Sequence, residues 1–179
     1  MGTEHPDIPI TITYLEMTSP PSRTPPPPPA IPTAILRAEE PTVSFYRYLY
    51  NTVGAPWTWT EIRKKPDEEV QKTIHDPNVS VMVLYVRGVP AGFAQFDFRD
   101  MPTAADLNYF GLIPDFIGRG LGPWFLHWAI GELWSRNPDR VTLNTCTEDH
   151  PSALGMYQKA GFVPYDRKEA FLTPMAAFE

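Results

Sequence analysis

The stretch that decides the fold is Gly118-Arg119-Gly120-Leu121-Gly122, which lies between a predicted strand and a predicted helix. The first turn of a helix has backbone N–H groups without intrahelical partners, and the helix dipole favours an anion there. Glycines allow the backbone to approach phosphate oxygens closely, and Arg119 offers a charge-assisted contact. The stretch therefore predicts a loop that binds a phosphorylated ligand.

Two other phosphate-binding loops fit this stretch poorly. A Walker loop ends in Gly-Lys-Ser or Gly-Lys-Thr, and the chain contains neither. A dinucleotide fingerprint has a different glycine spacing and follows the first strand of its unit, whereas several predicted elements precede this loop. A purely structural glycine turn remains an alternative for the loop taken alone.

Outward from the loop, the chain alternates between strand-like and helix-like patterns. The predicted strands are 8–17, 79–86, 91–98, 106–113, 140–146 and a last one from 162, and the predicted helices are 41–53, 57–75 with an interruption at Pro66, about 120–135, and 151–160. Gly88 marks the turn of a hairpin, and the helix after the loop makes a strand–helix–strand crossover. The order predicts a mixed α/β sheet flanked by helices.

Proline is the outlier of the composition. Eleven of the 22 prolines fall within the first 41 residues, and Pro25 to Pro29 form an unbroken run. Such a run favours polyproline II and cannot enter a helix interior or a central strand. We expect one domain over 1–179, with a semi-rigid Pro-rich connection at about 18–41. A partner-docking proline motif is the alternative interpretation of that connection.

Charge and cysteine content exclude several classes of protein. A net charge of −6 argues against a general nucleic-acid binder, which normally shows a basic face. The single cysteine, Cys146, excludes an intramolecular disulfide and a thiolate metal cluster, and the histidines show no metal spacing. Without a signal pattern or a long apolar run, the expectation is a cytoplasmic protein that needs no metal and no membrane.

A second motif lies about 35 residues downstream of the loop. Ala153, Tyr157, Gly161 and Phe162 have the spacing Ala-x-x-x-Tyr-x-x-x-Gly-Phe at the end of a strand–helix unit. Together with the glycine loop, in this order, the pattern resembles the GNAT superfamily of acetyl-CoA-dependent N-acetyltransferases. The resemblance covers roughly residues 79–172, and it implies the GNAT-like fold, with a largely antiparallel twisted sheet.

The resemblance also implies where acetyl-CoA would bind. The strand ending at Leu112 and Ile113 is expected to splay from the strand over 141–146, so that the pantetheine pairs with its open backbone. The residues implied in cofactor binding are Leu112, Ile113, Ile117, Gly118, Arg119, Gly120, Leu121, Gly122, Asn144, His150 and Tyr157. Ile117 stands where the family usually has Gln or Arg, and His150 stands where many members have Asn. Phosphate binding is therefore expected to rest on the loop amides and Arg119.

For the chemistry, the resemblance makes Tyr157 the general acid that protonates the leaving thiolate, with a tyrosine packed on the cofactor tail as the alternative. The general base is expected to be Asp106, at the start of a central strand, where some members carry a catalytic glutamate. Glu16, His150 and a water chain are the alternatives.

The region before residue 75 is expected to select the acceptor. Its candidate substrate-binding residues are Tyr46, Tyr50, Trp57 and Trp59, of which at least half are expected to be core. Aromatic faces hold ammonium groups by cation–π attraction, which suits a small cationic or aromatic amine.

Several functional alternatives remain open at this level. The expected activity is acetyl transfer to a primary amine of a small molecule or amino acid. Acetylation of a protein N-terminus or lysine, and a non-catalytic acyl-CoA sensor, are the competing hypotheses, and an interaction protein that uses the proline stretch is a third. A longer acyl donor and a homodimer are both compatible with the sequence.

Overall fold

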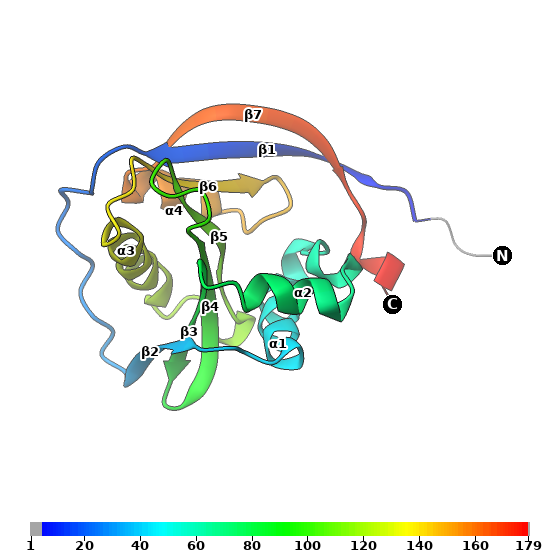
Figure 1. Cartoon of the computed structure of the whole chain (residues 1–179), viewed down its shortest axis with the longest axis horizontal. Helices are drawn as coiled ribbons and strands as arrows, with labels where there is room; N and C mark the ends of the chain where they lie inside the picture. The colour runs from blue at the N-terminus through cyan, green and yellow to red at the C-terminus, as the bar shows by residue number, and fades with distance from the viewer. Residues whose placement is uncertain (1–4, 179) are drawn as a thin grey trace.

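The computed structural model describes residues 5–178 (Figure 1). Its elements are β1 (Ile8–Met17), β2 (Thr33–Ala38), α1 (Val43–Gly54), α2 (Asp67–Ile74), β3 (Val79–Val86), β4 (Val89–Asp97), β5 (Ala105–Leu112), α3 (Leu121–Trp134), β6 (Val141–Cys146), α4 (Ala153–Ala160) and β7 (Val163–Leu172), with short 3₁₀ turns between some of them. No helix within residues 5–178 has the length and apolar character needed to cross a membrane.

One seven-stranded sheet, in the order β2-β3-β4-β5-β6-β1-β7, runs through the molecule. All neighbouring strands are antiparallel except β5 and β6, which are joined by the crossover helix α3. Helices α1 and α2 cover one face, and α3 and α4 cover the other (Figure 1). The predicted mixed, largely antiparallel α/β sheet is confirmed.

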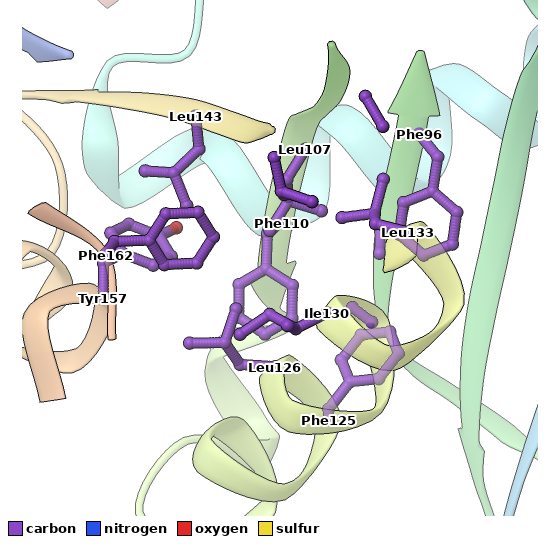
Figure 2. Packing of buried hydrophobic residues seen from close by; sticks show 14 of the residues in the cluster. Phe96, Leu107, Phe110, Phe125, Leu126, Ile130, Leu133, Leu143, Tyr157 and Phe162 are labelled. Carbon is purple, nitrogen blue, oxygen red and sulfur yellow. The ribbon is translucent and has the colours of Figure 1, made fainter. Parts of the chain in front are cut away.

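Each face of the sheet has its own buried cluster. Figure 2 shows the cluster under α3 and α4, in which Phe110 of β5 packs against Phe125 of α3 with ring centroids 5.2 Å apart. Tyr157 of α4 meets Phe162 edge-on in the same cluster. These contacts bury the apolar faces of both helices, which is the main source of their stability. They also fix the beginning of α3 and the tyrosine of α4 relative to β5.

Two details of the predicted element order are wrong. Residues 33–38 form the edge strand β2, antiparallel to β3, so the Pro-rich connection is limited to 18–32. The stretch 57–75 is not one interrupted helix, because it contains the 3₁₀ turn Ile62–Lys64 and only then α2. Helix α1 begins after its N-cap Thr42, whose hydroxyl accepts from the Phe45 amide at 3.3 Å.

The position of β1 determines the path of the chain. β1 lies between β6 and β7 and pairs with both, near one side of the sheet, whereas β2 forms the opposite edge. Residues 18–32 must therefore cross the whole sheet, and they do so around the outside of α3 (Figure 1). The stiff proline run is part of this crossing.

Candidate active site

The gap between β5 and β6 is the central feature of the site. These two strands pair only at Ala105–Val141 and Asp106–Thr142, and no further pair joins them in the described chain. Beyond that point β5 follows β4 and β6 follows β1, so the two strands separate. The predicted splay is confirmed, and it leaves the backbone edge of β5 open to a ligand.

A β-bulge lies just where the gap opens. Gln95 of β4 is opposite Tyr109, and Phe96 is opposite Leu107, so Asn108 is the extra residue. Bulges re-aim side chains and are frequent beside active sites. Asn108 lines the cavity described below, and its side-chain Oδ1 accepts from Gln95 Nε2 at 3.0 Å. The amide side chain is thereby held in one orientation at the narrow end of the gap.

A single cavity of about 1070 Å³ fills the gap and extends past both of its ends. It brings together most of the predicted site residues, which are Leu112, Ile117, Gly118, Gly120, Leu121, Gly122, Asn144, His150 and Tyr157 for the cofactor, and Tyr50, Trp57 and Trp59 for the acceptor. Four predicted residues do not line it: Ile113, Arg119, Tyr46 and Asp106. No group of three metal-binding side chains is found within residues 5–178.

At one end of the cavity lies the glycine loop. Gly118 and Gly120 have φ angles of +80° and +75°, a region that favours glycine, and beyond the adjacent residues no described atom lies within 4 Å of a Cβ built on either. Gly120 is the N-cap of α3 without a side-chain cap, so the first amides of the helix are free for an anion. Arg119 stacks on Phe116, with its guanidinium 5.1 Å from the ring centroid. Its charge therefore lies beside the loop.

Tyr157 forms part of the cavity wall between the two ends. Its ring is packed edge-on against Phe110 and Phe162, and only 8% of the residue is exposed. Burial, and secondarily the negative charge of Asp149, raises the pKa of the Tyr157 phenol above its usual range. The hydroxyl stays protonated at neutral pH, and the role of Tyr157 as general acid stays a prediction.

Asp149 is a site residue that the sequence did not reveal. One of its carboxylate oxygens accepts from Trp59 Nε1 at 3.1 Å, and the other accepts from Thr145 Oγ1 at 2.6 Å and from the Cys146 amide at 2.9 Å. It thus connects the loop after α1 to the end of β6. The only sequence signal for Asp149 is its position just before the predicted helix 151–160.

His150, the next residue, orders the start of α4. Its Nδ1 accepts from the Ser152 amide at 3.0 Å, and its ring lies 4.7 Å from the ring of Trp57. The imidazole therefore fixes the turn just before α4, whose N-cap Ser152 makes no side-chain capping bond of its own. His150 lines the cavity, and its contact with the cofactor stays a prediction.

The other end of the cavity is aromatic and acidic. Tyr50, Trp59 and Tyr109 pack against one another with centroids 5.1–5.5 Å apart. The Tyr109 hydroxyl donates to Glu61 Oε2 at 2.9 Å, and Glu61 also lines the cavity. Sequence reasoning missed Glu61, because it lay in a charged stretch without a distinguishing pattern.

Two predicted residues lie behind the wall. Tyr46 is 1% exposed and donates to Gln95 Oε1 at 2.6 Å, so it supports the wall from inside the core. Asp106 accepts from Thr142 Oγ1 at 2.6 Å and from Asn108 Nδ2 at 3.4 Å. Burial raises the pKa of Asp106, and these two hydrogen bonds oppose the shift. Its assignment as the general base stays a prediction, and the structure places Asn108 between it and the cavity.

Comparison with known proteins agrees with this geometry. The acetyltransferase (GNAT) family model matches residues 46–162. No curated protein matches the chain.

Solved structures with a similar fold have little sequence in common with the chain. A conserved protein of unknown function from Staphylococcus epidermidis has a TM-score of 0.64 at 15% identity, covering 94% of this chain and 63% of that one. A GCN5-related N-acetyltransferase from Sphaerobacter thermophilus has a TM-score of 0.57 at 17% identity, covering 95% of this chain and 54% of that one. An aminoglycoside acetyltransferase from an uncultured soil metagenomic sample has a TM-score of 0.58 at 15% identity, covering 72% of this chain and 87% of that one. The chain thus spans less than two thirds of the first two proteins.

Proposed function

The chain belongs to the acetyltransferase (GNAT) family, and we propose that it moves the acetyl group of acetyl-CoA directly to a primary amine of a small molecule. Members of this family generally use acetyl-CoA, and a general acetyl-transfer activity follows from membership. The acceptor and its binding residues are the proposal.

One observation carries the proposal. A continuous cavity joins the glycine loop to the aromatic and acidic end through the gap between β5 and β6. With the diphosphate of CoA at the loop, the pantetheine would follow the open edge of β5 and bring the thioester to the narrow part of the gap, near Asn108. An amine held at the aromatic end would then meet the thioester carbonyl.

Starting from a neutral amine, the reaction needs two proton transfers, and an acceptor that arrives as an ammonium ion must lose one further proton beforehand. Attack of the neutral amine nitrogen on the carbonyl carbon forms the C–N bond and breaks the C–S bond, so the nitrogen loses a proton and the sulfur gains one. Tyr157 supplies the proton to the thiolate, since its phenol is protonated at neutral pH. An alkyl ammonium has a pKa of about 10, so a proton must first leave the acceptor.

Glu61 suits the acceptor side of this reaction. Its carboxylate lies in the cavity wall, is oriented by Tyr109, and is surrounded by aromatic faces that attract an ammonium group. It would bind the cationic amine, accept its proton and pass the proton to water, because Glu61 itself is exposed. Asp149 accepts three hydrogen bonds already and is less suited to accept a proton.

The shape of the acceptor end favours a small molecule over a protein chain. β1 and β7 cover this end, with Ile12 and Phe171 in the cavity wall. The segment before α2 is tied to the end of β7, since Thr60 Oγ1 donates to the Thr173 carbonyl at 3.1 Å. A polypeptide acceptor would need an open groove here, whereas a small amine needs only a pocket.

A thiol-release assay tests the proposal. Acetyl-CoA is supplied with a panel of small amines, amino acids and short peptides, and acetylated products are identified by mass spectrometry. We expect turnover with small cationic amines. Turnover confined to peptides would support the protein-acetylating alternative, and CoA affinity without transfer to any member would support the sensor alternative.

A further inference from the structure

The Pro-rich segment 18–32, here called the strap, forms part of the cavity wall. Pro21, Arg23, Thr24 and Pro26 line the same cavity as the glycine loop. The strap lies outside residues 46–162, over which the chain matches its family. A family pattern therefore says nothing about this part of the wall.

The strap is fixed to the domain at several points. Arg23 Nη1 donates to the Lys159 carbonyl in the last turn of α4. Further along, Ile31 packs against the core, and the Pro32 carbonyl accepts from the Arg87 amide at 2.9 Å. Between these points the five prolines restrict the backbone to extended conformations. The strap is therefore already ordered before any ligand binds, which lowers the entropy lost on binding.

The strap faces a groove between α3 and α4 that starts at the glycine loop. Gly122 lies beside Met156, whose sulfur would be 3.7 Å from a Cβ on the glycine. Lys159 is three residues further along α4, about 4.5 Å along the helix axis. The part of the cavity next to Arg23 is therefore displaced from the loop along α4. Lys159 lies beside Arg23 there, and His127 of α3 also lines the cavity.

The two ends of acetyl-CoA must leave the diphosphate in different directions. If the glycine loop holds the diphosphate, the pantetheine would enter the gap beside Leu112 and extend toward Asn108. The nucleotide would then occupy the groove under the strap. The basic side chains of the cavity wall include Arg23 and Lys159, which meet at the end of α4, and His127 of α3. The acceptor end has mixed charge, since Glu61 and Asp149 line the cavity together with Lys64. A doubly negative ribose phosphate fits the basic end.

We propose that the strap is the third wall of the nucleotide site and that Arg23 binds the ribose 3′-phosphate of CoA. One guanidinium nitrogen of Arg23 is engaged by Lys159, and no ion pair of the described residues includes Arg23. The remaining donors are free for a phosphate, which arginine recognises through two parallel hydrogen bonds. This inference rests on the proposed function, because it assumes that CoA is bound.

The test compares CoA with 3′-dephospho-CoA, by calorimetry, for the wild-type chain, Arg23→Gln and a control variant. Arg37→Gln is the control, because Arg37 is an exposed arginine of β2 that does not line the cavity. We expect Arg23→Gln to weaken CoA binding about tenfold, which is about 1.4 kcal/mol. Its affinity for 3′-dephospho-CoA should change less than about twofold, within the small effects typical of surface substitutions, and Arg37→Gln should leave both affinities unchanged.

The comparison separates this inference from the proposed function. If Arg23→Gln lost the same affinity for both ligands, or lost affinity for neither, the assignment of Arg23 to the 3′-phosphate would be overturned. Failure of the wild-type chain to bind either ligand would instead contradict the proposed function. Thermal unfolding of both variants checks that the strap remains attached. A large decrease in the unfolding temperature of Arg23→Gln would also count against the assignment, because it would show that Arg23 has a structural role.

Discussion

Replacing Gly120 by glutamate and by glutamine isolates the electrostatic contribution of the glycine loop. Gly120 has a φ of +75°, and beyond its adjacent residues no described atom lies within 4 Å of a Cβ built there. Either side chain therefore fits without a clash, and both carry the same backbone penalty of about 1–2 kcal/mol for a left-handed conformation. The difference between the two variants is then one negative charge at the beginning of α3.

That charge has opposite effects on binding and on folding. For a carboxylate about 6 Å from one phosphate charge and an effective dielectric constant of about 20–40, Coulomb's law gives roughly 1.4–2.8 kcal/mol. We therefore expect the glutamate variant to bind CoA about 10- to 100-fold more weakly than the glutamine variant. In the free protein the same carboxylate interacts favourably with the helix dipole, by about 0.3–1 kcal/mol, so the glutamate variant should unfold at the same or a higher temperature.

Titration calorimetry with CoA at low and high ionic strength measures the first effect, and thermal unfolding measures the second. Gly131→Glu is the matched control, because Gly131 is an exposed glycine of α3 ten residues after its start, about 15 Å away. It adds the same charge beyond a Debye length of about 8–10 Å and should leave CoA affinity unchanged. Equal CoA affinities for Gly120→Glu and Gly120→Gln would refute the assignment of the loop to phosphate.

Three further comparisons test other parts of the site and of the fold around it. Tyr157→Phe removes only a hydroxyl from a packed ring, so kcat should fall about 100-fold with little change in CoA affinity, as measured by steady-state kinetics and calorimetry. Glu61→Gln should raise the KM for the amine and lower kcat/KM more than Asp106→Asn does, and the reverse order would restore Asp106 as the base. Gly54→Ala would place a Cβ 2.2 Å from the Trp59 Cβ, so denaturant unfolding should show a free energy of unfolding about 1–3 kcal/mol lower than that of the wild-type chain. In the control Gly131→Ala, the free energy of unfolding should rise by about 0.5–1 kcal/mol.

Sequence reasoning succeeded where local residues determine local structure. The glycines at 118 and 120 have backbone angles that favour glycine, and the crossover from β5 through α3 to β6 follows from the order of the patterns. The spacing from Ala153 to Phe162 singled out Tyr157, which the structure places in the buried cluster and in the cavity wall. These features depend on short stretches of chain, and a single sequence contains them in full.

The rest depends on contacts between distant segments. β2 was hidden, because Thr33 to Ala38 follows a proline run and gains its order from pairing with β3. Tyr46 and Tyr50 lie one helical turn apart on α1, yet only Tyr50 reaches the cavity, since Gln95 of β4 binds the hydroxyl of Tyr46. Glu61 acquires its position from Tyr109, which is 48 residues away in the chain.

The separation of β5 from β6 creates a structural problem that Asp149 solves. A sheet is held together by its ladder, and this ladder is interrupted after Asp106 and Thr142. Something else must fix the width of the gap, because the proposed reaction requires the thioester and the amine to meet within it. The Asp149 carboxylate provides a bridge, since Trp59 on the α1 side and Thr145 on β6 both donate to it. A neutral asparagine would offer one oxygen to three donors, so the charge at 149 is required by the hydrogen bonds alone. The same carboxylate adds to the effect of burial in raising the pKa of the Tyr157 phenol, so the residue that bridges the gap also acts on the proposed proton donor.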